Sequence, residues 1–223
     1  MSTPQETPLT PEHSKPPSGD DRPTLEDLFE QAAQLRQAIQ NHTQSLDKPQ
    51  RGPMPPQLPY VADELLRRLA ADQYARGVRD DGSLVGPDFE LMRTVDADNT
   101  AALQRIIDTH GWPGHSLVGE QAAHGAWLIA QHGELDFQLR ALGLLREAVD
   151  RGEATPAQLA YLTDRCLMRQ ERPQLYGTQY RDVGDGRGMQ LWEVADPETL
   201  DARRAEVGLG PQAEYEAAVR STY

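Results

Sequence analysis

Five consecutive segments of this chain carry apolar residues at intervals of three and four, which is the period of an α-helix. They span residues 60–78, 89–110 (or 96–110), 119–133, 135–152 and 155–170. Glycine and proline separate them: "GWPG" stops the second segment, Gly152 fits a C-cap, and Thr155 with Pro156 fits an N-cap followed by N1. This pattern predicts a mainly α domain with about five core helices.

The period changes from helical to two after residue 170. Residues 175–183 and 189–194 alternate, and "GDGRG" between them is a turn signal, so a β-hairpin is expected. Asp196 and Pro197 then fit the N-cap and N1 of a short helix, and "PQAEYEAAVRSTY" fits another. The predicted fold is therefore a helical domain with a C-terminal β-hairpin and two short terminal helices.

The N-terminal quarter differs in composition from the rest of the chain. Residues 1–22 are rich in proline, serine, threonine and charge, so we expect a disordered tail. Residues 23–46 fit an isolated amphipathic helix, and 47–59 fit a proline-rich linker before the domain at 60–223. The apolar stripe of the isolated helix suits docking on the domain, docking on a protein partner or second copy, or no docking at all.

Charge and composition exclude several classes of function. The net charge is −13 and the sequence pI is about 4.8, without a basic stripe, so nucleic-acid and anionic-membrane partners are not expected. No apolar run reaches the length of a membrane span, and no signal-peptide pattern opens the chain, which favours a cytoplasmic protein. Cys166 is the sole cysteine, so no internal disulfide is expected.

Polar residues interrupt the apolar faces of the predicted helices. Asp72 and Arg76 continue the face of Leu65 and Leu69 at helical spacing. The next three helices place on their apolar faces Asn99, His110, Gln131, His132 and Gln138. Burying such groups unpaired costs about 1–3 kcal/mol each, so the set predicts helix ends that converge on a shared polar cavity. The alternative is that these groups cap one another and neighbouring loops.

The segment "PQLYGTQ" at 173–179 is more polar than a core strand and more aromatic than an ordinary loop. In an extended strand Gln174, Tyr176 and Thr178 would share one side, with Gln179 on the other. This side fits a wall of the cavity. The alternative is a hairpin that packs its tyrosines on the helices and leaves its glutamines in solvent.

Several motif words occur here in order: "ADQYAR", "DADNTAALQRIIDTHGWPG", "VGEQAAHGAWLIAQHG", "LAYLTDR", "PQLYGTQ" and "DARRAEVGL". Over about residues 60–215 they resemble the bacterial family catalogued as domain of unknown function 6624. The resemblance implies no established activity. Most of the polar residues above fall within these words, although the family pattern assigns them no role.

The motifs of metal and nucleophile sites are missing from the sequence. No histidine pair stands at i and i+4, no HExxH or second cysteine occurs, and neither GxSxG nor a phosphate-binding glycine loop is found. We therefore expect neither a metal nor another cofactor.

Acid–base chemistry by histidine remains, since an imidazole exchanges protons near neutral pH. His132 and His110 are the candidate catalytic residues, with Asp72 to orient an imidazole. The candidate residues for binding a small polar substrate are Arg76, Asn99, Gln131, Gln138, Asp164, Arg165, Gln174, Tyr176 and Gln179. Asp164 and Arg165 also fit a structural ion pair. A non-catalytic module that senses a ligand or binds a protein is the alternative, favoured by the tethered helix at 23–46.

Overall fold

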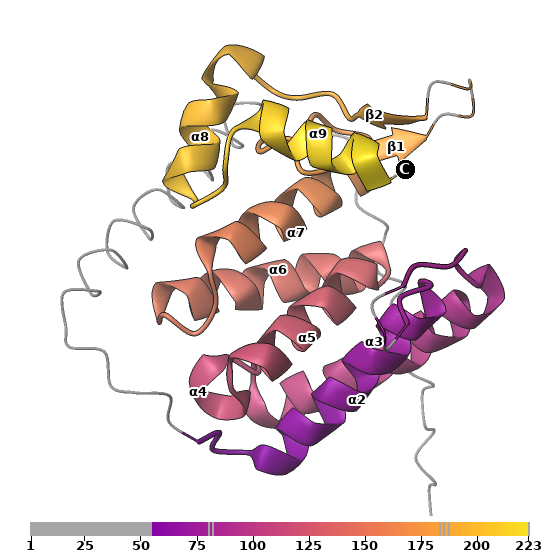
Figure 1. Ribbon diagram of the computed structural model, residues 1–223. Coiled ribbons are helices and arrows are strands. Elements are labelled where there is room, and N and C mark those ends of the chain that lie inside the picture. The colour runs from indigo at the N-terminus through magenta and orange to yellow at the C-terminus, as the bar shows by residue number, and fades with distance from the viewer. Residues whose placement is uncertain are drawn as a thin grey trace, which may run out of the picture.

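The computed structural model describes residues 55–79, 81, 83–182, 184, 186 and 188–222. The predicted tail at 1–22, the helix at 23–46 and most of the linker at 47–59 lie outside these residues. The described part is mainly helical with one two-stranded hairpin near its C-terminus, which confirms the predicted fold class (Figure 1).

The helical part follows the predicted segments closely. Its elements are α2 (Pro59–Ala75), α3 (Phe89–His110), α4 (His115–Val118), α5 (Glu120–His132), α6 (Leu135–Asp150) and α7 (Pro156–Arg169). The second helix starts at Phe89, because Asp88 caps it by accepting from the amides of Glu90 and Leu91. Thr155 and Gln158 form a capping box at α7, as the sequence indicated for Thr155. The one-turn helix α4 was not predicted.

Helix α5 lies at the centre of the helical part and packs against α2, α3 and α7 (Figure 1). Its alanines Ala122, Ala126 and Ala130 are buried, and so is Gly125. A Cβ at Gly125 would lie 3.3 Å from Cβ of Leu69, so the glycine permits the close approach of α2. Small residues thus bring α2 and α5 together, and side chains of both helices can meet at one edge.

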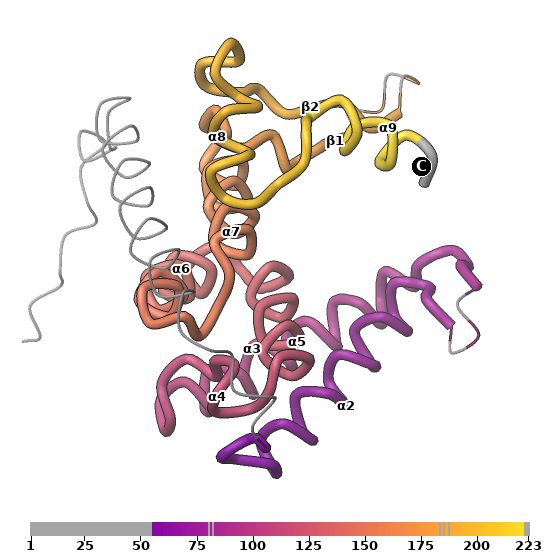
Figure 2. Tube along the Cα trace, turned by 60° about the vertical axis from the view of Figure 1, so that its left-hand side comes forward, coloured from indigo at the N-terminus to yellow at the C-terminus, as the bar shows by residue number. Residues whose placement is uncertain are grey.

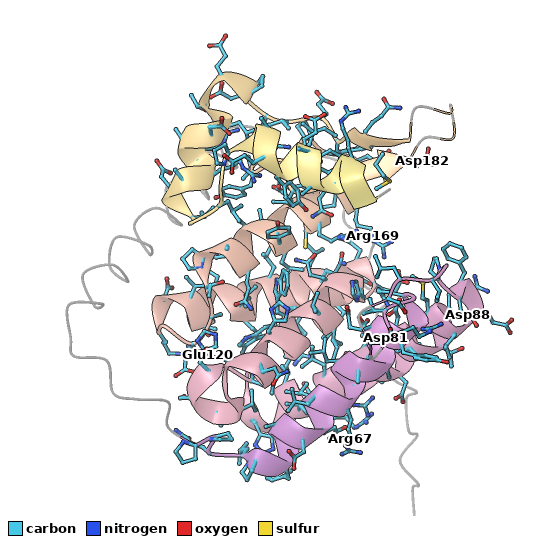
Figure 3. The ribbon with its side chains drawn as sticks, in the orientation of Figure 1. Arg67, Asp81, Asp88, Glu120, Arg169 and Asp182 are labelled. Atoms are coloured by element: carbon cyan, nitrogen blue, oxygen red, sulfur yellow. The ribbon has the colours of Figure 1, made fainter. Side chains whose placement is uncertain are left out.

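Three helices end at that edge. Gly125 faces Leu69, and His132 reaches Asp72, so α2 and α5 run in parallel. Trp127 Nε1 donates to the carbonyl of Gln158, and further along both helices Gln131 lies beside Arg165, so α7 runs in parallel with α5 as well. The C-terminal ends of α2, α5 and α7 therefore meet where α6 begins, and Figure 3 shows Arg169 of α7 there, between the helices and the C-terminal elements.

The C-terminal unit comprises β1 (Tyr180–Asp182), β2 (Met189–Leu191), the 3₁₀ turn η1 (Pro197–Thr199), α8 (Leu200–Glu206) and α9 (Gln212–Thr222). The strands are antiparallel, with Tyr180 opposite Leu191. The unit lies on α7, on a different side of the α5–α7 layer from α2 and α3 (Figure 2). Asp196, expected as an N-cap, makes no side-chain bond to a helix amide and instead accepts from Oγ1 of Thr199.

The hairpin is shorter than the sequence predicted, and the strand expected at 175–179 is wrong. Residues 174–179 form a loop with all six residues buried, so no single side of it faces the helices. The reason is Asp164 of α7. Its carboxylate accepts from the amides of Leu175 at 2.8 Å, Tyr176 at 3.1 Å and Thr178 at 3.1 Å, and from Oγ1 of Thr178 at 3.0 Å.

Other buried polar groups complete this loop. Gln174 Nε2 donates to the carbonyls of Gln179 and Trp192, and its Oε1 accepts from the amide of Gln179. Two arginines of α8, each 2% exposed, donate to loop carbonyls: Arg203 Nε to Leu175 at 2.9 Å and Arg204 Nη1 to Tyr176 at 2.7 Å. The arginines were not among the predicted residues, although they lie in the motif word "DARRAEVGL".

Among the helices that the structure describes, none is both long enough and apolar enough to cross a membrane.

Candidate functional site

A cavity of about 170 Å³ opens at the edge where α2, α5 and α7 end and α6 begins. It is lined by Arg76, Gln131, His132, Gly133, Gln138, Arg165 and Arg169. Five of these seven were predicted as site residues from the sequence, four of them from the helical faces and Arg165 as a possible partner of a carboxylate. Within the described part of the chain, three arginines and no carboxylate line this cavity.

Asp72 forms a hydrogen bond with the imidazole of His132. Its carboxylate is 1% exposed, and Oδ1 lies 2.8 Å from Nδ1 of His132. Gln73 Nε2 donates to Oδ2 at 2.9 Å, and Arg76 Nη1 forms an ion pair with Oδ1 at 2.9 Å. A neutral imidazole bonded in this way carries its proton on Nδ1 and keeps Nε2 as a base. In the described residues no hydrogen bond occupies Nε2.

Arg76 also joins α2 to α3. Its Nη2 donates to both carboxylate oxygens of Asp96, at 2.9 and 3.1 Å. Asp96 was not among the predicted residues, although it stands three residues before Asn99 on α3 and so shares its side of the helix. Ligand atoms of Asp72, Asp96 and His132 lie within 4.8 Å of one another, a set that could hold a metal ion. The Arg76 guanidinium already supplies the positive charge between the two carboxylates.

Gln138 lines the cavity and carries an unsatisfied acceptor. Its Nε2 donates to the backbone carbonyl of Gln131 at 2.8 Å, which determines the orientation of the amide. Its Oε1 is then buried without a hydrogen-bond partner in the described structure, and the residue is 1% exposed. Such an orphaned acceptor costs about 1–3 kcal/mol, so a donor from a bound molecule would recover this energy.

Gln131 of α5 and Arg165 of α7 line the cavity side by side. The Gln131 amide is best satisfied when its oxygen accepts from Trp127 Nε1 at 3.3 Å and from the amide of Leu162 at 2.8 Å. Its NH₂ group then takes the position 3.5 Å from Nε of Arg165. Burial lowers the pKa of the Arg165 guanidinium, and the nearby charges of Arg169 and Arg76 lower it further. This part of the lining thus presents donors and positive charge.

His132 and Gly133 also line a second hollow of about 300 Å³. Its other lining residues are Arg93, Asp96, Ala97, Thr100 and Glu134. The imidazole therefore stands between two hollows, one facing α7 and one facing α3.

The remaining predicted residues do not line the cavity. His110 accompanies Tyr60, whose hydroxyl lies 3.3 Å from Nε2, at the other end of α2. Twelve residues of helix, about 18 Å, separate Tyr60 from Asp72. Asp164, Gln174, Tyr176 and Gln179 serve the C-terminal loop, where they bond one another or the backbone.

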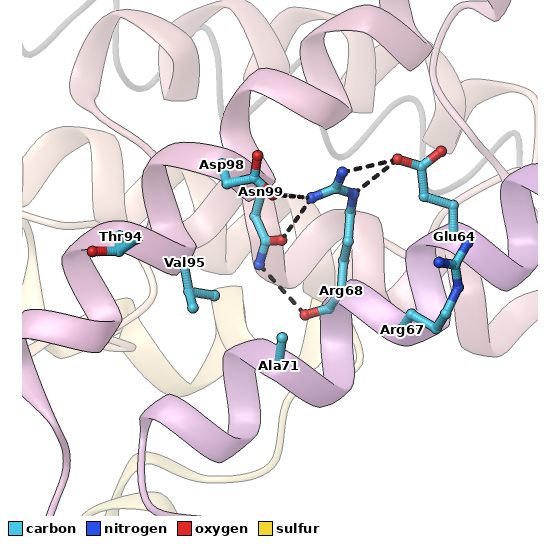
Figure 4. A pocket seen from close by; sticks show the side chains of 8 residues that line it. All are labelled: Glu64, Arg67, Arg68, Ala71, Thr94, Val95, Asp98 and Asn99. Carbon is cyan, nitrogen blue, oxygen red and sulfur yellow. Dashed lines mark hydrogen bonds and ion pairs between the residues drawn. The ribbon is translucent and has the colours of Figure 1, made fainter.

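Asn99 lies in a separate groove of about 430 Å³ between α2 and α3, shown in Figure 4. Its Oδ1 accepts from Nη1 of Arg68 at 3.2 Å. Arg68 also pairs with Asp98 and Glu64, so the polar groups at the centre of this groove satisfy one another.

The thiol of Cys166 offers no nucleophile near the cavity. The residue is buried, and this burial raises the pKa of the thiol to about 12. The thiolate that would attack a substrate is therefore absent at neutral pH.

The model of a family of unknown function (DUF6624) matches residues 59–223. No curated protein and no solved structure matches the chain.

Proposed function

Since this chain belongs to the family of unknown function DUF6624, its function has to come from the site itself, and we propose that the cavity is an active site for acid–base catalysis on a small polar substrate. His132 is the proton carrier. Asp72 positions its imidazole and stabilises the imidazolium that forms when Nε2 takes a proton.

One observation carries this proposal: a buried carboxylate holds Nδ1 of a histidine whose ring lines a polar cavity. His132 directs Nδ1 to Asp72, and its Nε2 has no hydrogen-bond partner among the described residues. A positioned base of this kind contributes about 10²–10⁴ in rate.

The lining supports a small polar substrate. Gln131 and Gln138 supply amide donors and acceptors, and Arg76 and Arg165 supply charged donors. None of the seven lining residues has an apolar side chain, so the cavity does not suit a lipid chain. Among the other residues predicted to bind substrate, Asp164, Gln174 and Tyr176 act through the C-terminal loop and are proposed as supporting residues.

A non-catalytic interaction module is the second candidate. The tip of the α2–α3 pair exposes the apolar residues Tyr74, Leu84, Val85 and Phe89, between 46% and 69% accessible. Exposed apolar groups that cluster in this way are typical of protein contact sites. In this alternative the protein senses a ligand that binds in the cavity, and no reaction follows binding.

Incubation with a mixture of small metabolites, followed by mass spectrometry, tests the proposal. We expect the wild-type protein to consume at least one small polar compound and His132→Asn to lose about 10²–10⁴ of that rate. His110→Asn is the matched control, because it removes a histidine at the far end of α2, and it should retain full turnover. Compounds that bind without being consumed would favour the interaction module, whereas turnover that survives His132→Asn would mean that His132 is not the proton carrier.

A further inference from the structure

The residues that line the cavity indicate a more specific class of ligand than a small polar molecule. We infer that the cavity binds a small carboxylate with a hydroxyl group on the adjacent carbon, the carboxylate held by Arg165 and Arg169 and the hydroxyl by Oε1 of Gln138. This inference rests on the proposed function only for the identity of the site, because binding of such an anion needs no catalysis.

Arginine supplies the positive charge in the lining. Arg76 is neutralised by Asp72 and Asp96, and Arg169 pairs with Glu134, whose side chain is 92% exposed. Arg165 has no carboxylate partner among the residues that the structure describes, although it is only partly exposed. An unpaired guanidinium in a partly buried wall attracts an anion, and its planar fork matches a carboxylate.

The neighbouring charges act in the same direction. Arg169 and Arg76 oppose the charge of Arg165, and an anion between them would relieve that repulsion. Gly133 and Gln138 flank the start of α6, whose N-terminus has no side-chain cap. The positive end of this helix dipole adds to the attraction for a negative group.

Gln138 selects a second group on the ligand. Its Oε1 is buried, unpartnered and able only to accept, because Nε2 is committed to the carbonyl of Gln131. The donor that it needs is a hydroxyl, since an ammonium group would face three arginines. A hydroxyl next to a carboxylate also lies within reach of His132, which lines the same small cavity.

Binding is measured by calorimetry on the full chain carrying His132→Asn, so that turnover cannot consume the ligand. The probes are lactate, propionate, which lacks the hydroxyl, and inorganic phosphate. We expect lactate to bind more tightly than propionate by about 5-fold, the worth of one neutral hydrogen bond, and phosphate to bind more weakly than lactate.

Variants of the lining identify the contacts. Arg165→Gln should weaken the affinity for lactate by about 10- to 100-fold. Arg165→Lys keeps the charge but loses the two parallel donors of the guanidinium, and should weaken the affinity by less. Gln138→Leu should make the affinity for lactate equal to that for propionate, and should leave the affinity for propionate unchanged. Arg140→Gln removes the same charge from α6, at a residue that pairs with Asp108 and does not line the cavity, and should leave lactate binding unchanged.

The outcomes separate this inference from the proposed function. Equal affinity for lactate and propionate, or phosphate binding that is tighter than lactate and indifferent to Gln138, would overturn the ligand class. Lactate binding that depends on Arg165 and Gln138 supports it, even if the wild-type protein turns over no metabolite, in which case the acid–base proposal alone fails.

Discussion

At the scale of single residues, Asp164 and Arg165 are neighbours on one helix whose side chains contact different parts of the molecule. The sequence allowed them to form an ion pair with each other. In the structure Asp164 faces the C-terminal loop and accepts hydrogen bonds from its backbone, whereas Arg165 faces the cavity. Residues one position apart on a helix point about 100° away from each other, so this separation follows from helical geometry.

The ionisation of Asp164 gives the first prediction. Burial raises its pKa to about 6 from the ordinary 3.8, while the four donor groups of the loop act to lower it. With the folded pKa above the unfolded value, this group stabilises the fold most below pH 3.8 and loses that contribution as the pH rises through 6. The difference in free energy of unfolding between wild type and Asp164→Asn, from urea titrations, should therefore be larger at pH 4.5 than at pH 7.5.

The comparison with the variant cancels the titration of all other carboxylates. A difference that grows with pH would mean that the loop donors outweigh burial and that the pKa is depressed. At either pH we expect Asp164→Asn to be less stable by at least about 2 kcal/mol, because its NH₂ group would meet backbone donors.

A pair of buried glutamines gives the second prediction. Gln138 leaves one acceptor unpaired, whereas Gln174 uses both ends of its amide, and the two are 1% and 0% exposed. Gln138→Met should change the free energy of unfolding by less than about 1 kcal/mol, since the lost bond is offset by removal of the orphaned oxygen. Gln174→Met should cost about 2–4 kcal/mol, because it leaves loop groups buried without partners. Equal losses in thermal or urea unfolding would mean that Gln138 is a structural residue.

At the scale of elements, helices were predictable and the loop at 174–179 was not. The helical segments carry their own signal in apolar spacing and in caps such as Thr155. The loop alternates in type like a strand, but its conformation is dictated by Asp164, ten residues before Gln174, and by Arg203 and Arg204, far beyond it. Hydrogen bonds between distant segments leave no periodic trace in the sequence.

Glycine at 177 gives the third prediction. Gly177 has φ +64, and a Cβ there would lie 2.7 Å from Oε1 of Gln212 and 3.3 Å from Cδ2 of Leu200. Gly177→Ala should therefore destabilise the protein by about 1–3 kcal/mol, through the left-handed backbone and the displaced neighbours.

Gly143 is the matched control for this substitution. It lies inside α6, and a Cβ there would meet nothing within 4 Å. Gly143→Ala should raise the free energy of unfolding by about 0.5–1 kcal/mol, since alanine is the better helix former. Urea unfolding of both variants checks the opposite signs, and a neutral Gly177→Ala would show that the loop adapts.

At the scale of the whole molecule, the site depends on which helix ends meet. Periodicity correctly placed Asp72, Gln131 and Gln138 on buried faces. It could not distinguish the two ends of a face, which is why His110 and His132 were grouped although they lie at opposite ends of the bundle. The parallel arrangement of α2, α5 and α7 determines which helix ends meet. This arrangement depends on packing between helices, such as that of Gly125 on Leu69.

The attachment of the C-terminal unit gives the last prediction. A row of aromatic rings connects α5 to the hairpin: Trp127 with Tyr161, Tyr161 with Tyr215 and Tyr215 with Tyr180, at centroid distances of 5.8, 6.0 and 5.9 Å. Among these four aromatic residues, Tyr215 of α9 alone has ring contacts with both α7, through Tyr161, and β1, through Tyr180. Its hydroxyl also donates to the carbonyl of Thr178.

Tyr215→Ala should therefore loosen the C-terminal unit and leave α2 to α6 intact. Hydrogen exchange followed by mass spectrometry should show faster exchange in residues 174–182 and 189–222 and unchanged exchange in α5. Tyr215→Phe keeps the rings and loses one hydrogen bond, worth about 1 kcal/mol, so its exchange should stay close to wild type. Faster exchange throughout the helical part would instead mean that the unit and the helices unfold together, and the cavity would then depend on α9 for its shape.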